Sequence, residues 1–325
     1  MDDLLNNPWI KIIYKISMVE EMQVRKWIEE LENELAEKNR FFPDGKVLKL
    51  VDKLVDKLVD APHKVLEKGT KIFRARTIDK YHEQQYFSSL RNDINRIISV
   101  HIPDFDINNG NYALMNLAEY VQKNNIKNIF DTEEQKIINK YGVKAWWGYN
   151  ETESDAPPQG IAGAGRINPK GISYLYAADN KKTAALEVRP VISQYVSIAE
   201  IEIKSDLNLF DFTTQYDLGC SQKEWDCSIV LSVLSEYFSS PNYSGDTAYL
   251  ATQYISEYIK HIKTSNGKKL FDGLCFKSSL DNEGLNYVLF DISETKKYKI
   301  NNSSIYQMMD LTGKLQQQLP LSNEM

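Results

Sequence analysis

An arginine and a glutamate, Arg166 and Glu187, lie near the two ends of a short stretch of the chain that runs from Gly165 to Pro190. A guanidinium group suits a phosphate, because it can donate two parallel hydrogen bonds to phosphate oxygens. A carboxylate stabilises positive charge that develops on a substrate while a bond breaks. The pair therefore suggests chemistry on a nucleotide. Without partners from elsewhere in the chain, a surface hairpin with a solvated ion pair would explain the two residues better.

The residues between these two charges predict a turn, a strand and a helix that would position them. The run Asn168-Pro169-Lys170-Gly171 is typical of a turn, since proline presets φ and glycine accepts a positive φ. Residues 173–178 are apolar and aromatic enough for a short buried strand. Asp179 or Asn180 is expected to cap a helix whose body is 183–187.

The first part of the chain predicts helices. Apolar residues recur at steps of three and four over residues 9–40. The tetrapeptide Lys-Leu-Val-Asp then occurs three times in succession from Lys49 to Asp60, which favours a helix with a broad apolar stripe. We interpret residues 1–68 as an N-terminal helical lobe whose stripe packs on its own domain.

The remaining residues, 69–325, predict a second domain of strands and helices. It opens with an alternating strand at 71–76, and residues 77–145 predict a helical insertion within it. Later strands are expected at 195–203, 207–210, 273–277, 286–291, 297–300 and 304–308, and later helices at 225–238 and 249–262. Because these elements follow no strict β-α-β order, we expect a fold of the α+β class, with a mixed sheet and flanking helices.

Composition and spacing argue against several classes of protein. The formal net charge of −6 disfavours direct nucleic-acid binding over a broad surface. No apolar run approaches the ~20 residues of a membrane span, and the N-terminus is acidic where a signal peptide is basic. The 4 histidines and 3 cysteines lack metal-ligand spacing, so we expect no metal site. So few cysteines fit a reducing cytoplasm, where we expect the protein to be.

Three separated blocks of motifs resemble the RES domain family, which is named for an Arg, a Glu and a Ser. The matching motifs are Phe73-Arg74; Gly165-Arg166-x-Asn168-Pro169-x-Gly171, Leu175-Tyr176-x-Ala178 and Thr183-Ala184-x-x-Glu187; and Asp272-Gly273-Leu274-x-Phe276-x-Ser278-Ser279 with Gly284-x-Asn286-x-x-Leu289-Phe290. The resemblance covers about residues 70–310 discontinuously. It leaves the lobe 1–68 and the insertion 77–145 outside the family pattern.

Members of this family include the toxins of RES–Xre toxin–antitoxin pairs, whose fold is related to that of ADP-ribosyltransferases. The resemblance implies an enzyme that cleaves the nicotinamide–ribose bond of NAD by phosphorolysis or hydrolysis and acts as a growth-arresting toxin or defence effector. NAD would be its substrate and inorganic phosphate a co-substrate, with no bound cofactor. An Xre-type helix-turn-helix antitoxin is the implied partner. A homo-oligomer is a further expectation, whereas a membrane partner is not.

The resemblance also implies roles for charged residues. Glu187 would stabilise the oxocarbenium-like charge that develops on the ribose when the N-glycosidic bond breaks. Arg166 and Arg74 would share its pocket, where guanidinium groups hold the pyrophosphate or the attacking phosphate.

Three uncharged residues complete the implied site. Tyr176 would stack on or orient the nicotinamide ribose, and Asn286 would add a supporting polar contact. Ser278 aligns with the family serine and would orient the substrate, with its neighbour Ser279 as the alternative.

Two other functions stay open from the sequence. One is a mono-ADP-ribosyltransferase that transfers ADP-ribose to a protein. The other is a catalytically silent interaction module, in which the helical lobe binds a partner and the RES-like domain serves as scaffold. The sequence does not specify the acceptor of the ADP-ribose.

Overall fold

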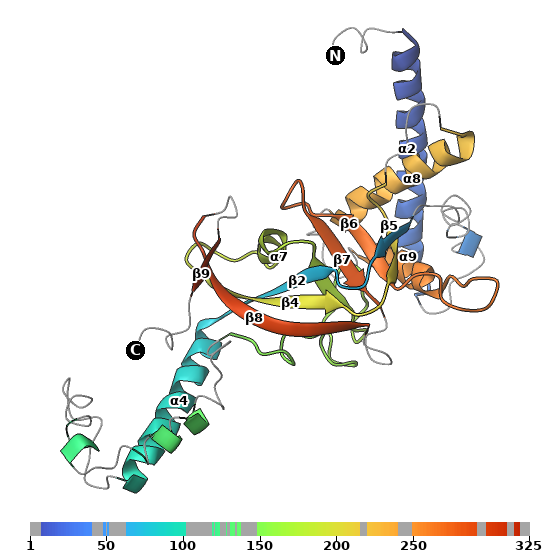
Figure 1. The fold of residues 1–325 in the computed structure, drawn as a ribbon. Helices are drawn as coiled ribbons and strands as arrows, with labels where there is room; N and C mark the ends of the chain where they lie inside the picture. Colours follow the sequence, from blue (N-terminus) through green and yellow to red (C-terminus); the bar gives the residue numbers. More distant parts are fainter. Residues whose placement is uncertain are drawn as a thin grey trace. The chain divides into compact units, whose positions relative to one another are not determined.

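The computed structural model, drawn in Figure 1, describes residues 8–40, 48–49, 51, 63–101, 119, 121–123, 128, 131–133, 135–137, 148–214, 220–239, 249–290, 297–310 and 315–318. The helices with described bounds are α2 (Pro8–Glu37), α4 (Lys80–His101), α7 (Lys181–Glu187), α8 (Gln222–Ser239) and α9 (Leu250–His261). The strands are β1 (His63–Leu66), β2 (Lys71–Thr77), β3 (Leu175–Ala178), β4 (Tyr195–Ile203), β5 (Leu207–Asp211), β6 (Gly273–Lys277), β7 (Leu285–Leu289), β8 (Tyr298–Met308) and β9 (Leu315–Gln318).

The chain divides into two compact units. Unit 1 comprises Met1–Arg74, Asp155–Glu187 and Ile201–Lys299, and unit 2 comprises Ala75–Ser154, Val188–Glu200 and Ile300–Met325. The strands β2, β4 and β8 each contribute residues to both units. These boundaries differ from the predicted 1–68 and 69–325, and that division into domains stays a prediction.

The sheet of unit 1 has the strand order β1-β5-β6-β7-β3-β2. Neighbouring strands are antiparallel except for β5 and β6, which are parallel. Phe276, Asn286, Ala178 and Phe73 form one row across four adjacent strands. Asn286 therefore lies in a strand next to β3, the strand that leads into α7. The mixed sheet with its helices confirms the predicted α+β class.

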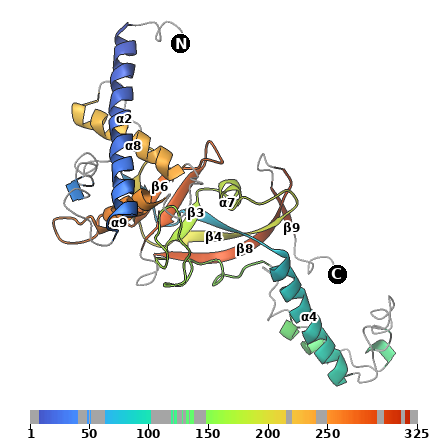
Figure 2. The same ribbon diagram turned by 180° about the vertical axis from the view of Figure 1, so that it is seen from behind.

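Three helices of unit 1 bury a shared apolar cluster. On α2, the side chains of Val24, Ile28, Leu31 and Leu35 recur at steps of four, three and four and are at most 2% exposed. This face packs on α8 and α9, which lie beside α2 in both views of the fold (Figures 1 and 2). Phe238 of α8 is fully buried in the same cluster. Burial of each such side chain contributes ~1.5–3 kcal/mol. The cluster thereby holds the carboxyl end of α8 in place, where the carbonyl oxygen of Phe238 accepts a hydrogen bond from Arg166.

Unit 2 has its own small core. It contains α4 and strands in the order β2-β4-β8-β9. Ile78, Tyr149 and Ile305 form a buried apolar cluster within it. The guanidinium carbon of Arg76 lies 3.9 Å from the centroid of the Tyr149 ring. Arg76 therefore has a structural contact here, as a cation over an aromatic face.

Most predicted strands and helices begin and end within a few residues of the observed ones, and the differences concern short strands. His63–Leu66, inside the predicted lobe 1–68, forms β1 because it pairs antiparallel with β5. A four-residue run carries little strand signal by itself, so its pairing partner decides its structure. Residues 297–300 and 304–308, predicted as two strands, form the single strand β8. The strand β9 was not predicted.

Two predictions fall largely outside the described residues. The Lys-Leu-Val-Asp repeat at 49–60 is one of them, and much of the insertion 77–145 is the other. The described residues of the insertion that follow Asp79 and precede Gly148 are helical, including all of α4. Among the helices that the structure describes, none combines the length and the apolar character that crossing a membrane requires.

Candidate active site

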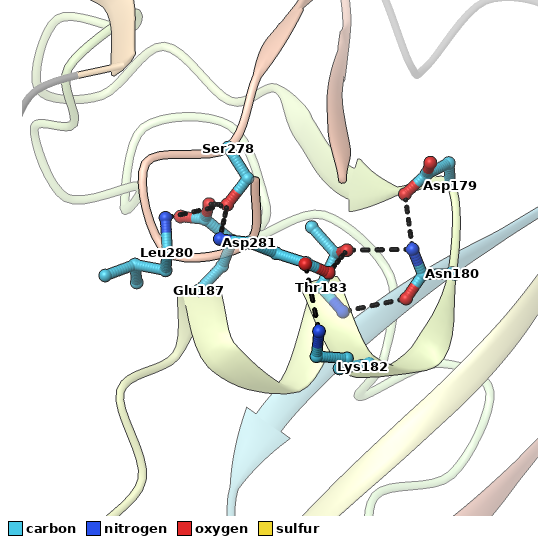
Figure 3. Close-up of polar contacts among 8 residues, drawn as sticks. All are labelled: Asp179, Asn180, Lys182, Thr183, Glu187, Ser278, Leu280 and Asp281. Carbon is cyan, nitrogen blue, oxygen red and sulfur yellow. Dashed lines mark hydrogen bonds and ion pairs between the residues drawn. The ribbon is translucent and has the colours of Figure 1, made fainter. Parts of the chain in front are cut away.

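Helix α7 carries Glu187 at its carboxyl end and begins just after β3. Of the two predicted caps, the structure uses Asn180, whose Oδ1 accepts a hydrogen bond from the backbone N–H of Thr183 at 2.9 Å. Asn180 Nδ2 also donates to Asp179 Oδ1 at 2.9 Å and to Thr183 Oγ1 at 2.8 Å (Figure 3). Such a cap is worth about 1 kcal/mol. It fixes the start of a helix of 7 residues and thereby the place of its last residue, Glu187.

The carboxylate of Glu187 is held by two neutral donors. Ser278, directly after β6, donates from Oγ to Glu187 Oε1 at 2.6 Å (Figure 3). Asn286, in β7, donates from Nδ2 to the same oxygen at 2.7 Å. Both donors are 7% exposed, and Glu187 is half-buried. Within the described part of the chain, Oε2 has no hydrogen-bond partner. One oxygen is therefore fixed by the protein and the other is available to a ligand.

The hydroxyl of Ser278 can direct its proton only to Glu187. Its oxygen accepts hydrogen bonds from the backbone N–H groups of Leu280 at 3.1 Å and Asp281 at 3.2 Å (Figure 3). A serine hydroxyl has one proton and two acceptor lone pairs, so both lone pairs are occupied. Ser279 is exposed. The geometry therefore favours Ser278 over Ser279 as the serine of the site.

Arg166 is anchored between the helices α8 and α9. Its Nη1 donates to the carbonyl oxygen of Phe238 in the last turn of α8, where the helix dipole favours a cation. Its own carbonyl oxygen accepts a hydrogen bond from Thr252 Oγ1 of α9 at 2.6 Å. The Nε atom of Arg166 is buried and has no hydrogen-bond partner among the described residues. The guanidinium thus keeps a donor for which an anionic ligand would be a suitable acceptor.

Asn168 organises the turn that precedes Tyr176. Its Nδ2 donates to the carbonyl oxygens of Gly163 and Ile172, both at 2.8 Å, and its Oδ1 accepts from the Tyr176 hydroxyl at 2.7 Å. A Cβ at Gly165 would lie 2.5 Å from Asn168 Oδ1 and 2.9 Å from the Tyr176 hydroxyl oxygen, so this contact requires glycine. Burial raises the pKa of Tyr176, and the hydroxyl therefore stays protonated as the donor to Asn168.

Arg74 approaches the site from β2. Its Nη1 donates to the carbonyl oxygen of Tyr176 at 3.0 Å, which ties the guanidinium to β3. Among the described residues, neither Arg74 nor Arg166 is a hydrogen-bond partner of Glu187. The structure thus brings three predicted residues into direct contact, the glutamate, the serine and the asparagine. That the two arginines share their pocket stays a prediction.

Three residues of this region have no role in the sequence analysis. Thr183 and Gly284 belong to the motifs, and motif membership is the signal that could have identified them. Thr183 and Gly284 lie against each other in the structure. A Cβ at Gly284 would lie 2.2 Å from Thr183 Oγ1, which explains the glycine at this position. Asp281 lies between the motif residues Ser278 and Gly284 and carries no sequence signal of its own.

Comparison with known proteins identifies the class. A family model described as the RES domain matches residues 139–309, which is more than half of the chain. The chain therefore belongs to the RES domain family, as its motifs predicted. The matched range includes Arg166, Tyr176, Glu187, Ser278 and Asn286, whereas Arg74 precedes it. A search of curated proteins and a search of solved structures each found no match.

Proposed function

We propose that this RES domain protein is an enzyme that consumes NAD by cleaving the bond between nicotinamide and ribose. The observation that carries the proposal is the carboxylate of Glu187, whose Oε1 accepts hydrogen bonds from Ser278 at 2.6 Å and Asn286 at 2.7 Å. A carboxylate fixed at one oxygen can present the other to a ribose without reorganising. Such preorganised charge is commonly the largest single contribution to catalysis.

In the proposed reaction, the electron pair of the N-glycosidic bond moves to the nicotinamide nitrogen. Positive charge then develops on the anomeric carbon of the ribose, and Oε2 of Glu187 stabilises it. The acceptor, water or inorganic phosphate, forms the new C–O bond and releases its proton to solvent. The products are nicotinamide and either ADP-ribose or its anomeric phosphate. Phosphate would be a co-substrate, and no bound cofactor takes part.

The binding roles follow from the donors that the site offers. Arg166 would hold the pyrophosphate through its buried Nε, which lacks a partner among the described residues. Arg74 would add a second cation beside Tyr176, to whose carbonyl oxygen it donates. Because the hydroxyl of Tyr176 already donates to Asn168, the aromatic ring is the part of Tyr176 that would orient the ribose.

The test is incubation of the purified protein with NAD, with and without inorganic phosphate, followed by chromatography of nicotinamide and the ADP-ribose product. Release of nicotinamide supports the proposal, and dependence on phosphate distinguishes phosphorolysis from hydrolysis. Protein carrying Glu187→Gln, purified in parallel, controls for contaminating enzymes. Intact NAD in every reaction, from folded protein without a bound inhibitor, would count against the proposal and favour an interaction module.

The acceptor can be examined in the same experiment. NAD labelled in its adenylate part is incubated with the protein and a cell lysate. Label that stays with macromolecules would favour a protein mono-ADP-ribosyltransferase. Label found only in small molecules favours the NAD-degrading reaction.

The biological role we propose is that of a cytoplasmic toxin or defence effector, since loss of NAD arrests growth. An Xre-type helix-turn-helix antitoxin would restrain it. Induced expression should stop growth and lower cellular NAD, and co-expression of a helix-turn-helix protein encoded beside it should restore both. Normal growth and normal NAD during expression of the folded protein would contradict this role.

A further inference from the structure

A second contact joins helix α7 to the loop 278–284, next to the one between Glu187 and Ser278. Asp281 Oδ2 accepts a hydrogen bond from Thr183 Oγ1 at 2.7 Å, and Oδ1 accepts one from Lys182 Nζ at 3.0 Å (Figure 3). Thr183 is 0% exposed and Asp281 is 8% exposed. The carboxylate of Asp281 is therefore bound to the first turn of the helix whose last residue is Glu187.

The two contacts lie on one face of α7. Thr183 and Glu187 are four residues apart, and residues at this spacing are neighbours on a helix surface. The loop is held in shape between them, because Ser278 N–H donates to the Gly284 carbonyl oxygen and Gly284 N–H donates to the Asp281 carbonyl oxygen, both at 2.9 Å. Loop and helix therefore meet at two levels one helical turn apart.

Asp281 also contacts Ser278 through its backbone. Its N–H donates to Ser278 Oγ at 3.2 Å and occupies one of the two lone pairs of the hydroxyl. If Asp281 moved, this lone pair would become available, and the hydroxyl proton could rotate away from Glu187. One residue thus binds the helix through its carboxylate and sets the orientation of the serine through its amide.

We propose that Asp281 is a positioning residue: by binding Thr183 and Lys182, it keeps the Ser278 hydroxyl directed at the carboxylate of Glu187. The catalytic consequence rests on the proposed function. A positioning role lowers kcat more than it changes KM, because small displacements of a preorganised group affect the transition state more than substrate binding.

The test compares matched variants of the full chain. Thr183→Val removes the hydroxyl and keeps the shape of the side chain, and Thr183→Ser restores a hydroxyl. Asp281→Ala removes the carboxylate that accepts from Thr183 and Lys182 and keeps the backbone N–H that donates to Ser278. The control is Asp272→Asn, since Asp272 accepts from the Asn208 N–H at 2.9 Å and from Lys297 at 2.5 Å, at the other end of β6 from Ser278.

Kinetics and amide hydrogen exchange are measured on the same proteins. In Thr183→Val, kcat should fall roughly tenfold to a hundredfold with KM within about twofold, and Thr183→Ser should recover most of the loss. The amides of Leu280 and Asp281 should exchange faster in Thr183→Val than in the wild type. The control Asp272→Asn should change neither kcat nor the exchange of these two amides. Should Thr183→Val fail to fold, Asp281→Ala, which removes the acceptor of the same hydrogen bond, takes its place in both measurements.

Two results would overturn the positioning role. One is wild-type kcat in a folded Thr183→Val, and the other is a raised KM with unchanged kcat. If the wild type itself leaves NAD intact, the proposed function fails. The positioning role of Asp281 is then tested by hydrogen exchange alone. Unchanged exchange at Leu280 and Asp281 then overturns it, whereas faster exchange that Thr183→Ser reverses supports it.

Discussion

The hydroxyl oxygen of Ser278 lies 2.6 Å from Oε1 of Glu187, although 91 positions separate the two residues in the sequence. The strand order explains the encounter. β7 lies between β6, which ends before Ser278, and β3, which leads into the helix of Glu187. Asn286, on the strand between them, supplies the second donor. The carboxylate is thus held by the residue directly after β6 and by a residue within the adjacent strand β7.

Replacing Glu187 by glutamine tests the role of its charge. The variant Glu187→Gln keeps an oxygen that can accept from Ser278 and Asn286 but removes the negative charge that would stabilise the ribose cation. We expect kcat to fall by about 10²–10³-fold, with NAD affinity within roughly threefold of the wild type. Steady-state kinetics and calorimetric binding of NAD measure the two effects. Losses of equal size in turnover and affinity would show that Glu187 acts in binding instead.

Removing the hydroxyl of Ser278 should disturb both the carboxylate and the loop. Ser278→Ala deletes the donor to Glu187 and leaves the amides of Leu280 and Asp281 without their acceptor. An unsatisfied buried polar group costs about 1–3 kcal/mol, so the free energy of unfolding should fall by an amount in this range. Urea unfolding and NAD turnover measure the two consequences.

The neighbouring serine provides the control for this variant. Ser279 is exposed, so Ser279→Ala should leave stability and turnover close to those of the wild type. If Ser279→Ala lost as much stability and turnover as Ser278→Ala, the contact of Ser278 with Glu187 would not explain the losses in Ser278→Ala.

The order of the motifs made part of this site predictable. Glu187 ends a helix and Asn286 lies in a strand that the sequence predicted, and the motifs of the RES family marked both residues as members of the site. The contact that joins them to Ser278 depends on which strands are neighbours in the sheet, and this order is set by tertiary pairing. The motifs therefore named the three residues that the structure brings into contact, Glu187, Ser278 and Asn286, but not the hydrogen bonds between them.

Asp281 and β1 show what the sequence could not predict. Asp281 sits in a loop whose polar residues would equally suit solvent, and only its contacts with Thr183 and Lys182 distinguish it. The strand β1 reads His-Lys-Val-Leu, two polar residues followed by two apolar ones, so no alternation of polar and apolar residues marks it in the sequence. Both gain their roles from residues far away in the chain.

Glycine at position 165 is required by the approach of two polar side chains. A Cβ there would lie 2.5 Å from Asn168 Oδ1 and 2.9 Å from the Tyr176 hydroxyl oxygen. Gly165→Ala should therefore lower the free energy of unfolding by about 1–3 kcal/mol, as overpacking does. Thermal unfolding measures the change. Gly163→Ala is the matched control, because nothing lies within 4 Å of a Cβ at Gly163, and equal destabilisation by the two variants would contradict the explanation.

Arginine at position 166 should matter for substrate affinity. Arg166→Lys replaces a planar group with several donors by a point charge, which cannot reproduce a bidentate contact with the pyrophosphate. We expect the dissociation constant for NAD to rise about tenfold or more, with a smaller change in kcat. Calorimetric titration measures it, and Arg91→Lys, at an exposed position on α4, is the control. If Arg166→Lys binds NAD as tightly as the wild type does, Arg166 does not hold the pyrophosphate.

Acid should weaken the fold partly through Asp281. The hydrogen bond from Thr183 lowers the pKa of Asp281, the ion pair with Lys182 lowers it further, and burial acts in the opposite direction. A carboxyl group whose pKa is lower in the folded state stabilises the fold above its unfolded pKa, about 3.9, and this contribution is lost as the pH falls through the folded value. The difference in free energy of unfolding between the wild type and Asp281→Asn should therefore stay constant from neutral pH to about 5 and shrink below about 4. Urea unfolding over this range measures it. A difference that grows toward acid pH would mean that Asp281 is not stabilised as a carboxylate in the folded protein.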